Sequence, residues 1–271
     1  MNKPVRLASE CFPRVWGSPH TEPWHRNFTR DNIGEIWFKA SGKLPLLVKL
    51  LFTADNLSVQ VHPNDAYASR HHQSCGKTEM WHILQAEPDA QVALGLKNAL
   101  SRERFRQACL NGEIVNLLNW FPARAGDTFF VPAGTVHAIG GGLTLCEIQQ
   151  FSDITYRLYD WGRSGRELHL KRGAEVAQRK THPGPAARQT LGDFRELLTD
   201  CEYFRTERLA VEGTVLCPSP LRDTIYIAVQ GDGTLDGTPF RQGEAWQVDA
   251  GTGAFEISSP AAVFLITTES S

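Results

Sequence analysis

An all-β fold with only minor helices is the fold class that the amino-acid sequence predicts. The apolar runs are short, rich in β-branched and aromatic residues, and separated by Gly, Pro, Asn or Asp, as in strands joined by turns. Seven Trp and 14 Phe against only two Met also favour β packing over helical bundles. The 271 residues are enough for one large or two moderate domains.

Seven strands and two helices are expected before the composition changes near residue 180. The strands are expected at 35–40, 44–54, 57–63, 79–86, 90–96, 127–133 and 143–150. One helix is expected over 101–112, where Ser101 can serve as the N-cap and Glu103 lies in the first turn. A second, weaker helical pattern covers 167–179 and has Gly173 in its middle.

The change in composition near residue 180 divides the chain. Residues 179–190 contain two Pro, one Gly and no apolar periodicity, so we predict a linker there. After it, strand-like runs recur about every eight to ten residues with Gly-Asp-Gly and Asp-Gly turns, as in an antiparallel sandwich or barrel. We therefore predict a β domain over 1–178 with a short helical insertion near 98–120, and a smaller β domain over 191–271.

Net charge and cysteine pattern limit the partners and the compartment. A net charge of −2 gives no basic surface for nucleic acid or acidic lipid, and no apolar stretch approaches the length of a membrane span. The six cysteines include no C-x-x-C pair, which favours free thiols in a reducing compartment. Residues 1–17 contain no continuous apolar segment, so we expect a cytoplasmic protein.

The segment LSVQVHPND, residues 57–65, begins with polar and apolar residues in alternation. Successive side chains of a strand point to opposite faces, so Ser58, Gln60 and His62 share one face. An ordinary half-buried strand turns its polar face to water. Because this face ends in an imidazole, it can instead look into a binding site.

Two further motifs carry residues of types that bind metal ions. In GKTEMWHIL, Lys77, Glu79 and Trp81 share one strand face, and in VPAGTVHAIGGG a turn precedes His137. Two His, one Glu and an amide oxygen make a mixed nitrogen and oxygen site that suits Zn²⁺. Ligands at alternate strand positions can converge inside a barrel. The order His-x, Glu, Pro-x-Gly-x-x-His in a β-barrel is the cupin pattern.

These motifs make the chain resemble the type I mannose-6-phosphate isomerase family in its short bacterial form. The matching stretches are LPLLVKLLFTADNLSVQVHPND, GKTEMWHIL, VPAGTVHAIGGG and EIQQFSDITYRLYDWGR, followed by RELHL. The resemblance runs from about residue 14 to residue 178 and is looser beyond. It implies a cupin (jelly-roll) β-barrel catalytic domain and a smaller C-terminal antiparallel cupin-like β domain, without the long helical domain of the larger enzymes.

The resemblance also implies an activity and a set of site residues. The implied activity is that of a zinc-dependent aldose–ketose isomerase, with one Zn²⁺ per chain, which interconverts mannose 6-phosphate and fructose 6-phosphate through an enediolate. By position, the implied zinc ligands are Gln60, His62, Glu79 and His137. The implied catalytic residues are Arg157, Lys77 and Glu147, and the implied substrate and phosphate-binding residues are Ser58, Lys77 and Arg163.

Several of these roles have alternatives in the sequence. Glu147 is our first choice for the general base, and Lys77, Asp153 and a zinc-bound water are the others. Arg157 and Asp153 are four residues apart and could form only a salt bridge. Arg163 could be a solvated loop arginine.

Two other classes of function fit part of the pattern. One is a different metal-dependent cupin, such as an iron or manganese oxygenase, because two His and a carboxylate also suit Fe²⁺. The other is a non-catalytic sugar-phosphate-binding β protein, since the C-terminal domain has no His after His182 and therefore no His-based metal site. The expected partner is a small-molecule sugar phosphate, and the chain is expected to be a monomer or a homodimer.

Overall fold

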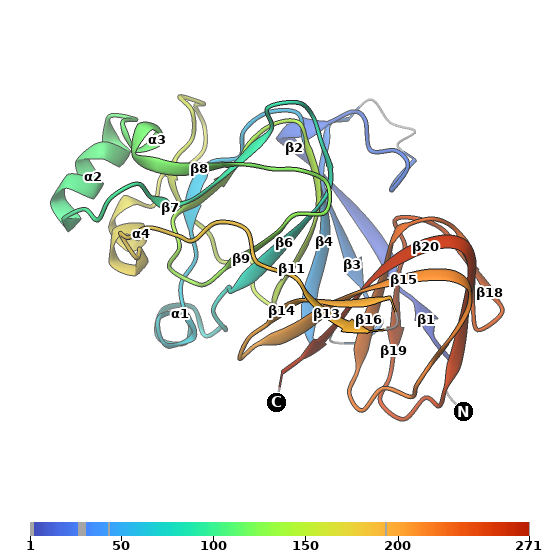
Figure 1. Ribbon diagram of the computed structural model, residues 1–271. Coiled ribbons are helices and arrows are strands. Elements are labelled where there is room, and N and C mark those ends of the chain that lie inside the picture. The colour runs from blue at the N-terminus through green and yellow to red at the C-terminus, as the bar shows by residue number, and fades with distance from the viewer. Residues whose placement is uncertain (1–2, 27–30, 43, 193, 271) are drawn as a thin grey trace.

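Three β-sheets and four short helices form the described part of the chain (Figure 1). The structure is a computed structural model that describes residues 3–26, 31–42, 44–192 and 194–270. The outer limits of the two predicted units, residues 1–2 and 271, lie outside this part. Strands make up most of the regular structure, so the predicted all-β fold with minor helices is confirmed.

Two antiparallel sheets face each other and form a barrel. The first has the order β2-β3-β4-β11-β6-β9, with bounds β2 (Ala8–Ser18), β3 (Ile33–Lys39), β4 (Leu46–Thr53), β11 (Leu143–Gln150), β6 (Glu79–Ala86) and β9 (Thr128–Val131). The second has the order β12-β5-β10-β7-β8, with bounds β12 (Tyr156–Tyr159), β5 (Val59–Val61), β10 (His137–Ile139), β7 (Gln91–Leu96) and β8 (Leu118–Pro122). Trp81 of the first sheet and Leu94 of the second belong to one buried cluster, so the inner faces meet.

The third sheet combines the C-terminal strands with the first strand of the chain. Its main path is β1-β19-β16-β20-β15-β14-β13, with bounds β1 (Val5–Arg6), β19 (Ala245–Val248), β16 (Thr224–Gln230), β20 (Phe255–Glu269), β15 (Phe204–Cys217), β14 (Arg195–Asp200) and β13 (Gln189–Gly192). A short hairpin of β17 (Gly233–Leu235) and β18 (Thr238–Phe240) pairs with β20. Both ends of the chain lie near this sheet (Figure 1).

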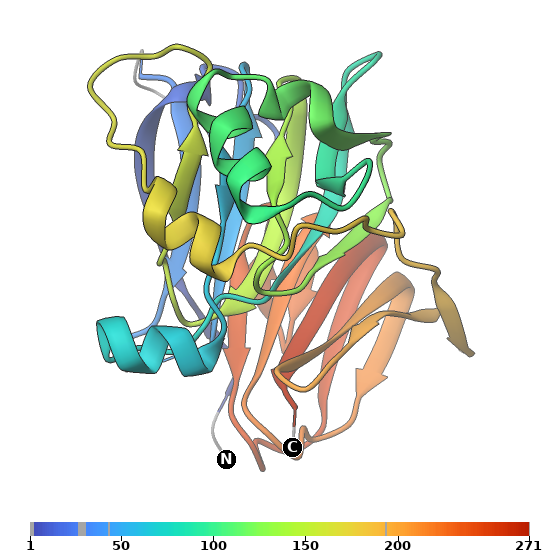
Figure 2. The same cartoon turned by 90° about the vertical axis from the view of Figure 1, so that its left-hand side faces the viewer.

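The helices gather on the side of the barrel away from the third sheet, as the two views agree (Figures 1 and 2). They are α1 (Asp65–His72), α2 (Arg102–Leu110), α3 (Ile114–Leu117) and α4 (Leu170–Val176). Ser101 caps α2 as predicted, because its hydroxyl accepts a hydrogen bond from the Arg104 amide at 3.2 Å. Helix α1 is not predicted by the sequence pattern, because only Ala68 of its residues is buried and no apolar periodicity marks it.

Alternating side-chain direction along β4, which is buried on both faces, explains how the layers are stacked. Val48, Leu50 and Phe52 point outward from the barrel and pack in one cluster with Ile225 and Leu265 of the third sheet. On the opposite side, the second sheet packs against the helices through a cluster that includes Val59, Val61, Phe105, Ile114 and Ala174. Apolar neighbours therefore cover both outer faces, and the polar residues of these strands are left facing the barrel interior.

The division of the chain near residue 180 stays our proposal. Strand β1 joins the third sheet although it precedes the barrel strands in sequence. The start of the predicted linker lies against the barrel, because Thr181 forms an isolated bridge with Gly95. Helices α2 and α3 occupy the region 98–120 where the insertion is predicted.

The cysteines and the helices bear on two further expectations. All six cysteines belong to the described residues, and none forms a disulfide. Burial raises the pKa of the Cys109 thiol to about 12 and that of the Cys217 thiol to about 11, so both stay protonated near neutral pH. Among the helices of the described residues, none is long and apolar enough to cross a membrane.

Candidate active site

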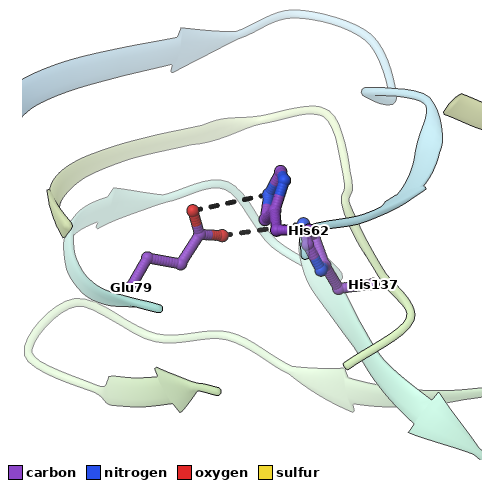
Figure 3. Close-up of side chains that lie close together, drawn as sticks. All are labelled: His62, Glu79 and His137. Carbon is purple, nitrogen blue, oxygen red and sulfur yellow. Dashed lines mark ion pairs between the residues drawn. The ribbon is translucent and has the colours of Figure 1, made fainter. Parts of the chain in front are cut away.

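Two histidines and one glutamate converge inside the barrel. His62 follows β5 and His137 begins β10, an adjacent strand of the second sheet, whereas Glu79 begins β6 of the facing sheet. Their side chains point toward one another, and one ligand atom from each lies within 4.8 Å of the other two (Figure 3). Nε2 of His62 is 3.5 Å from Glu79 Oε2, and Nε2 of His137 is 3.6 Å from Glu79 Oε1. We call these three residues the His–Glu–His triad.

Backbone carbonyls orient both imidazoles of the triad. Nδ1 of His62 lies 2.9 Å from the carbonyl oxygen of Ile154, and Nδ1 of His137 lies 2.9 Å from that of Thr135. A carbonyl oxygen can only accept, so each Nδ1 carries the proton and each Nε2 keeps a lone pair, which at His62 faces the Lys77 ammonium 3.1 Å away. Burial, followed by the charge of Lys77, lowers the pKa of His62 to about 4. Burial also lowers the pKa of His137, so both rings are neutral near pH 7.

Two polar atoms of the triad have no hydrogen-bond partner. Glu79 Oε1 and His137 Nε2 are buried, and neither bonds to any residue in the described ranges. An unsatisfied buried polar atom costs about 1–3 kcal/mol, so such atoms mark places where a bound group completes the structure. Two neutral imidazoles and a carboxylate are donors that divalent transition metals prefer. The triad therefore fits a metal ion.

Gln60 lies between the triad and Arg157 on the inner face of the second sheet. In the strand register, Gln60 of β5 is opposite His137 of β10 on one side and Arg157 of β12 on the other. Its side-chain oxygen accepts a hydrogen bond from the Ser58 hydroxyl at 3.4 Å. The alternation in residues 57–62 thus does turn its polar face inward, and a ligand role for Gln60 stays a prediction.

Lys77 and Glu147 form the charged surroundings of the triad. Lys77 Nζ is 3.1 Å from His62 Nε2, donates a hydrogen bond to Glu79 and lies 3.8 Å from Glu147 Oε1. Burial, the largest single effect, would lower the pKa of Lys77, but the charges of Glu147 and Glu79 outweigh it and raise the pKa. Glu147 is 4 % exposed and accepts a hydrogen bond from Lys49 Nζ at 3.1 Å.

A cavity of about 560 Å³ opens beside these groups. It is lined by Phe12, Arg14, Trp16, Glu35, Trp37, Lys49, Leu51, Leu57, Ser58, Gln60, Lys77, Glu147, Asp153, Thr155, Arg157 and Arg166. Five of these residues are basic and three are acidic, so the lining attracts an anion even before a metal cation is counted. The volume suits a small polar molecule.

Comparison with known proteins shows the family to which the chain belongs. The family model described as "Phosphomannose isomerase type I, catalytic domain" matches residues 21–100. Mannose-6-phosphate isomerase ManA of Bacillus subtilis is 36% identical over 254 residues, which cover 86% of this chain and 79% of that protein. The chain belongs to the type I phosphomannose isomerase family.

Two further relatives extend the comparison. Mannose-6-phosphate isomerase of Streptococcus mutans is 38% identical over 202 residues, which cover 72% of this chain but only 64% of that protein. The crystal structure of the mannose 6-phosphate isomerase from Bacillus subtilis superposes with a TM-score of 0.89 at 23% identity, covering 98% of this chain and all of that one. At that identity the match shows a shared fold, and it supports the predicted cupin architecture of this phosphomannose isomerase family member.

Arg157 and Arg163 occupy different environments in this member of the family. Arg157 lines the cavity, and its Nε is buried without a hydrogen-bond partner among the described residues. The ion pairs within the described ranges include none between Arg157 and Asp153, so the salt bridge considered as an alternative is not seen. Arg163 is not among the cavity-lining residues, and it donates to the carbonyl oxygen of Asn56 and lies 3.7 Å from the Asp160 carboxylate.

Several cavity residues are given no role by the sequence motifs, namely Arg14, Glu35, Trp37, Lys49 and Arg166. One signal for Lys49 exists, because it is the only charged residue in an apolar run whose strand is buried throughout. Its ammonium group also lies 4.5 Å from the centre of the Trp37 ring, a cation–π contact. Glu35 and Trp37 are two residues apart on β3 and therefore share one face of the strand. There Trp37 Nε1 donates a hydrogen bond to Glu35 at 2.6 Å.

Proposed function

We propose that this chain interconverts mannose 6-phosphate and fructose 6-phosphate with one zinc ion per chain. The observation that carries the proposal is the His–Glu–His triad, whose unsatisfied atoms lie next to a cavity that has more basic than acidic residues in its lining. Membership of the type I phosphomannose isomerase family supports an enzyme over a non-catalytic binding protein.

His62, Glu79 and His137 would hold the metal ion, and the amide oxygen of Gln60 would be a fourth ligand. Zinc is proposed because it prefers His and carboxylate ligands in a four-coordinate site. The chemistry supplied by a bound metal ion is Lewis-acid stabilisation of negative charge on the sugar oxygens. Iron and manganese accept similar donors, but an oxygenase acting on an apolar substrate has no use for five basic groups around its cavity.

The residues of the chain itself supply proton transfer and fixed charge. Isomerisation moves a proton between C2 and C1 of the open-chain sugar, with an enediolate between the two forms. Glu147 is our first choice for the base that takes this proton from one carbon and returns it to the other. Lys77 and Asp153, which also line the cavity, are the alternatives. Arg157 stays protonated and adds positive charge where the enediolate oxygens become negative.

The phosphate lies at the far end of the sugar, so its partners should be cavity cations and hydroxyls. Ser58 and Lys77 line the cavity, in keeping with their predicted substrate contacts. Arg163 does not line it, whereas Arg166 does, and Arg166 Nη1 is held 3.0 and 3.2 Å from the two oxygens of Asp160. We therefore propose Arg166 as the phosphate-binding arginine in place of Arg163.

Arg166→Ala is expected to raise the KM for mannose 6-phosphate by about 10- to 100-fold, the worth of one hydrogen bond to a charged group, with a smaller change in kcat. Arg163→Ala is the matched control, because Arg163 also faces Asp160 but lies outside the cavity lining. Steady-state kinetics on both variants test the assignment. A larger rise in KM for Arg163→Ala than for Arg166→Ala would restore Arg163 to the phosphate site.

The function itself is tested on the purified full chain. Metal-replete protein is expected to convert mannose 6-phosphate to fructose 6-phosphate at about 1–1000 turnovers per second, the usual range for enzymes. Chelation should abolish the conversion, and zinc should restore it while bound metal is measured by elemental analysis. Zinc-loaded protein that leaves mannose 6-phosphate unchanged, or activity that returns with iron and consumes dioxygen, would overturn the proposal.

A further inference from the structure

Arg157 lies on a strand whose outer edge pairs with no other strand of the described residues. Within the second sheet, β12 pairs only with β5 and ends the strand order. The backbone groups on the outer side of an edge strand need other partners. The register of β12 against β5 also shifts between Arg157 and Tyr159. The strand that carries the proposed catalytic arginine is thus short, terminal and irregular.

The segment from Glu167 to His169 provides the missing partners. The Arg157 amide donates to Nδ1 of His169 at 3.1 Å, and the Arg157 carbonyl accepts from the His169 amide at 2.7 Å. In addition, Nη1 of Arg157 donates to the carbonyl oxygen of Glu167 at 2.9 Å. His169 therefore bonds to both backbone groups of Arg157. At this residue it supplies the two hydrogen bonds that a neighbouring strand would otherwise make.

This arrangement fixes how Arg157 faces Gln60. Because both backbone groups of Arg157 point away from β5, Arg157 and Gln60 form a non-hydrogen-bonded pair of the ladder. In such a pair the two α-carbons are about 4.5 Å apart and the side chains are at their closest. The bonds from His169 thus hold the arginine side chain against the residue that separates it from the triad.

His169 is itself held in place by the next helix. It is the residue before α4, and its carbonyl oxygen accepts from the Gly173 amide at 2.8 Å. Helix α4 approaches β12 closely because residue 173 is glycine, and a Cβ there would lie 2.4 Å from Cδ2 of Leu158. A neutral ring is required for Nδ1 to accept, and burial lowers the pKa of His169 although Glu167, 3.9 Å from Nε2, raises it.

We propose that His169 is a positioning residue, which holds Arg157 in its active orientation through the hydrogen bond that its Nδ1 accepts from the Arg157 amide. This inference rests on the proposed role of Arg157 in the isomerase reaction. His169 does not line the cavity and acts through Arg157 alone.

The test compares side chains that keep or lose an acceptor at the Nδ1 position. His169→Leu should lower kcat by about 10- to 100-fold, as expected when a catalytic group is displaced by about 1 Å. KM and metal content should stay nearly unchanged. His169→Asn has the same size as leucine and keeps an oxygen acceptor near Nδ1, so it should recover most of the turnover. His169→Gln places its amide near Nε2 instead, so it also lacks an acceptor at the Nδ1 position and should lose turnover. It takes the place of His169→Leu in the comparison if the leucine variant does not fold.

Two comparisons separate positioning from simple support of the fold. His71→Leu makes the same change at an exposed histidine of α1 and should leave turnover unaltered. In an Arg157→Ala background, His169→Leu should cause no further loss, because the two residues act as one unit. Equal impairment by leucine and asparagine, or losses that multiply in the double variant, would overturn the proposal. Near-wild-type turnover of Arg157→Ala would instead overturn the proposed role of Arg157.

Discussion

Replacing His137 with asparagine is expected to remove the bound metal ion and with it nearly all isomerase activity. Asparagine keeps an N–H group near the position of Nδ1, which can still donate to the Thr135 carbonyl, but it has no atom at the position of Nε2. Removing a hydrogen bond to a metal ligand typically lowers metal affinity by about 10- to 100-fold. Removing the ligand itself should lower metal affinity by more than this. Because metal stabilisation of developing charge is worth several kcal/mol, turnover should fall by at least about 100-fold.

His82→Asn is the matched control for this experiment. His82 is also a buried histidine that bonds through Nδ1, here to the Thr128 hydroxyl at 2.9 Å, but it lies on the outer face of β6. It should keep its metal and its turnover even if the melting temperature falls. Metal content by elemental analysis, turnover and thermal melts are measured on the same samples. Full metal content in His137→Asn, or equal metal loss in both variants, would contradict a ligand role for His137.

Glu79→Gln repeats the metal test on the facing sheet. It preserves the shape of a fully buried side chain while removing the charge that Lys77 and the two histidines face. Burial would raise the pKa of Glu79, but the nearby Lys77 charge outweighs it and holds the pKa well below its usual range. The wild-type carboxylate is therefore ionised and ready to bind a cation, and the glutamine variant should lose the metal as His137→Asn does.

The inward-facing residues could be predicted from sequence because a strand has a period of two. Once Val59 and Val61 are assigned to the outer face, Gln60 must point into the barrel, whatever the details of the loops. The same reasoning separates Glu79 from Met80 on β6. Spacing along strands therefore predicted which residues of the first and second sheets meet in the interior.

The arginines of the loop after β12 could not be assigned in the same way. Trp161 and Gly162 both have positive φ, so the chain reverses sharply before Arg163. The geometry of this turn decides whether Arg163 or Arg166 reaches the cavity. The hydrophobic periodicity of the sequence does not indicate that geometry. Helix α1 could not be predicted for a related reason. Its eight residues bury little surface, so they leave no apolar pattern in the sequence.

The cavity wall contributed by β2 and β3 could not be predicted from the sequence, for a third reason. The sequence motifs do not include Arg14 and Glu35, because their ion pair at 3.0 Å depends on the pairing of β2 with β3. Lys49 could have been noticed as a lone charge in a buried strand. Its partner Glu147, opposite it on β11, is known only once the register of the two strands is known.

Arg157→Ala is expected to lower kcat and kcat/KM together by about 100- to 1000-fold, with metal content unchanged. Loss of one group that stabilises an oxyanion typically has this effect, because the interaction strengthens as charge develops in the transition state. The guanidinium is suited to the role, since Arg157 lines the cavity and its buried Nε has no partner among the described residues. Arg157→Lys keeps the charge but not the planar fork and should recover only part of the rate.

Two controls decide whether Arg157 acts in catalysis or only supports the fold. Arg179 donates to the carbonyl oxygens of Leu100 and Ala177 from outside the cavity, so Arg179→Ala should lower the melting temperature without changing turnover per folded molecule. Asp153→Ala tests the salt-bridge alternative, in which both partners would have equal effects on stability. Steady-state kinetics, thermal melts and metal content on the three variants distinguish these cases. An Arg157→Ala protein that keeps near-wild-type turnover, or that loses activity only in proportion to its loss of folded protein, would end the catalytic role assigned to Arg157.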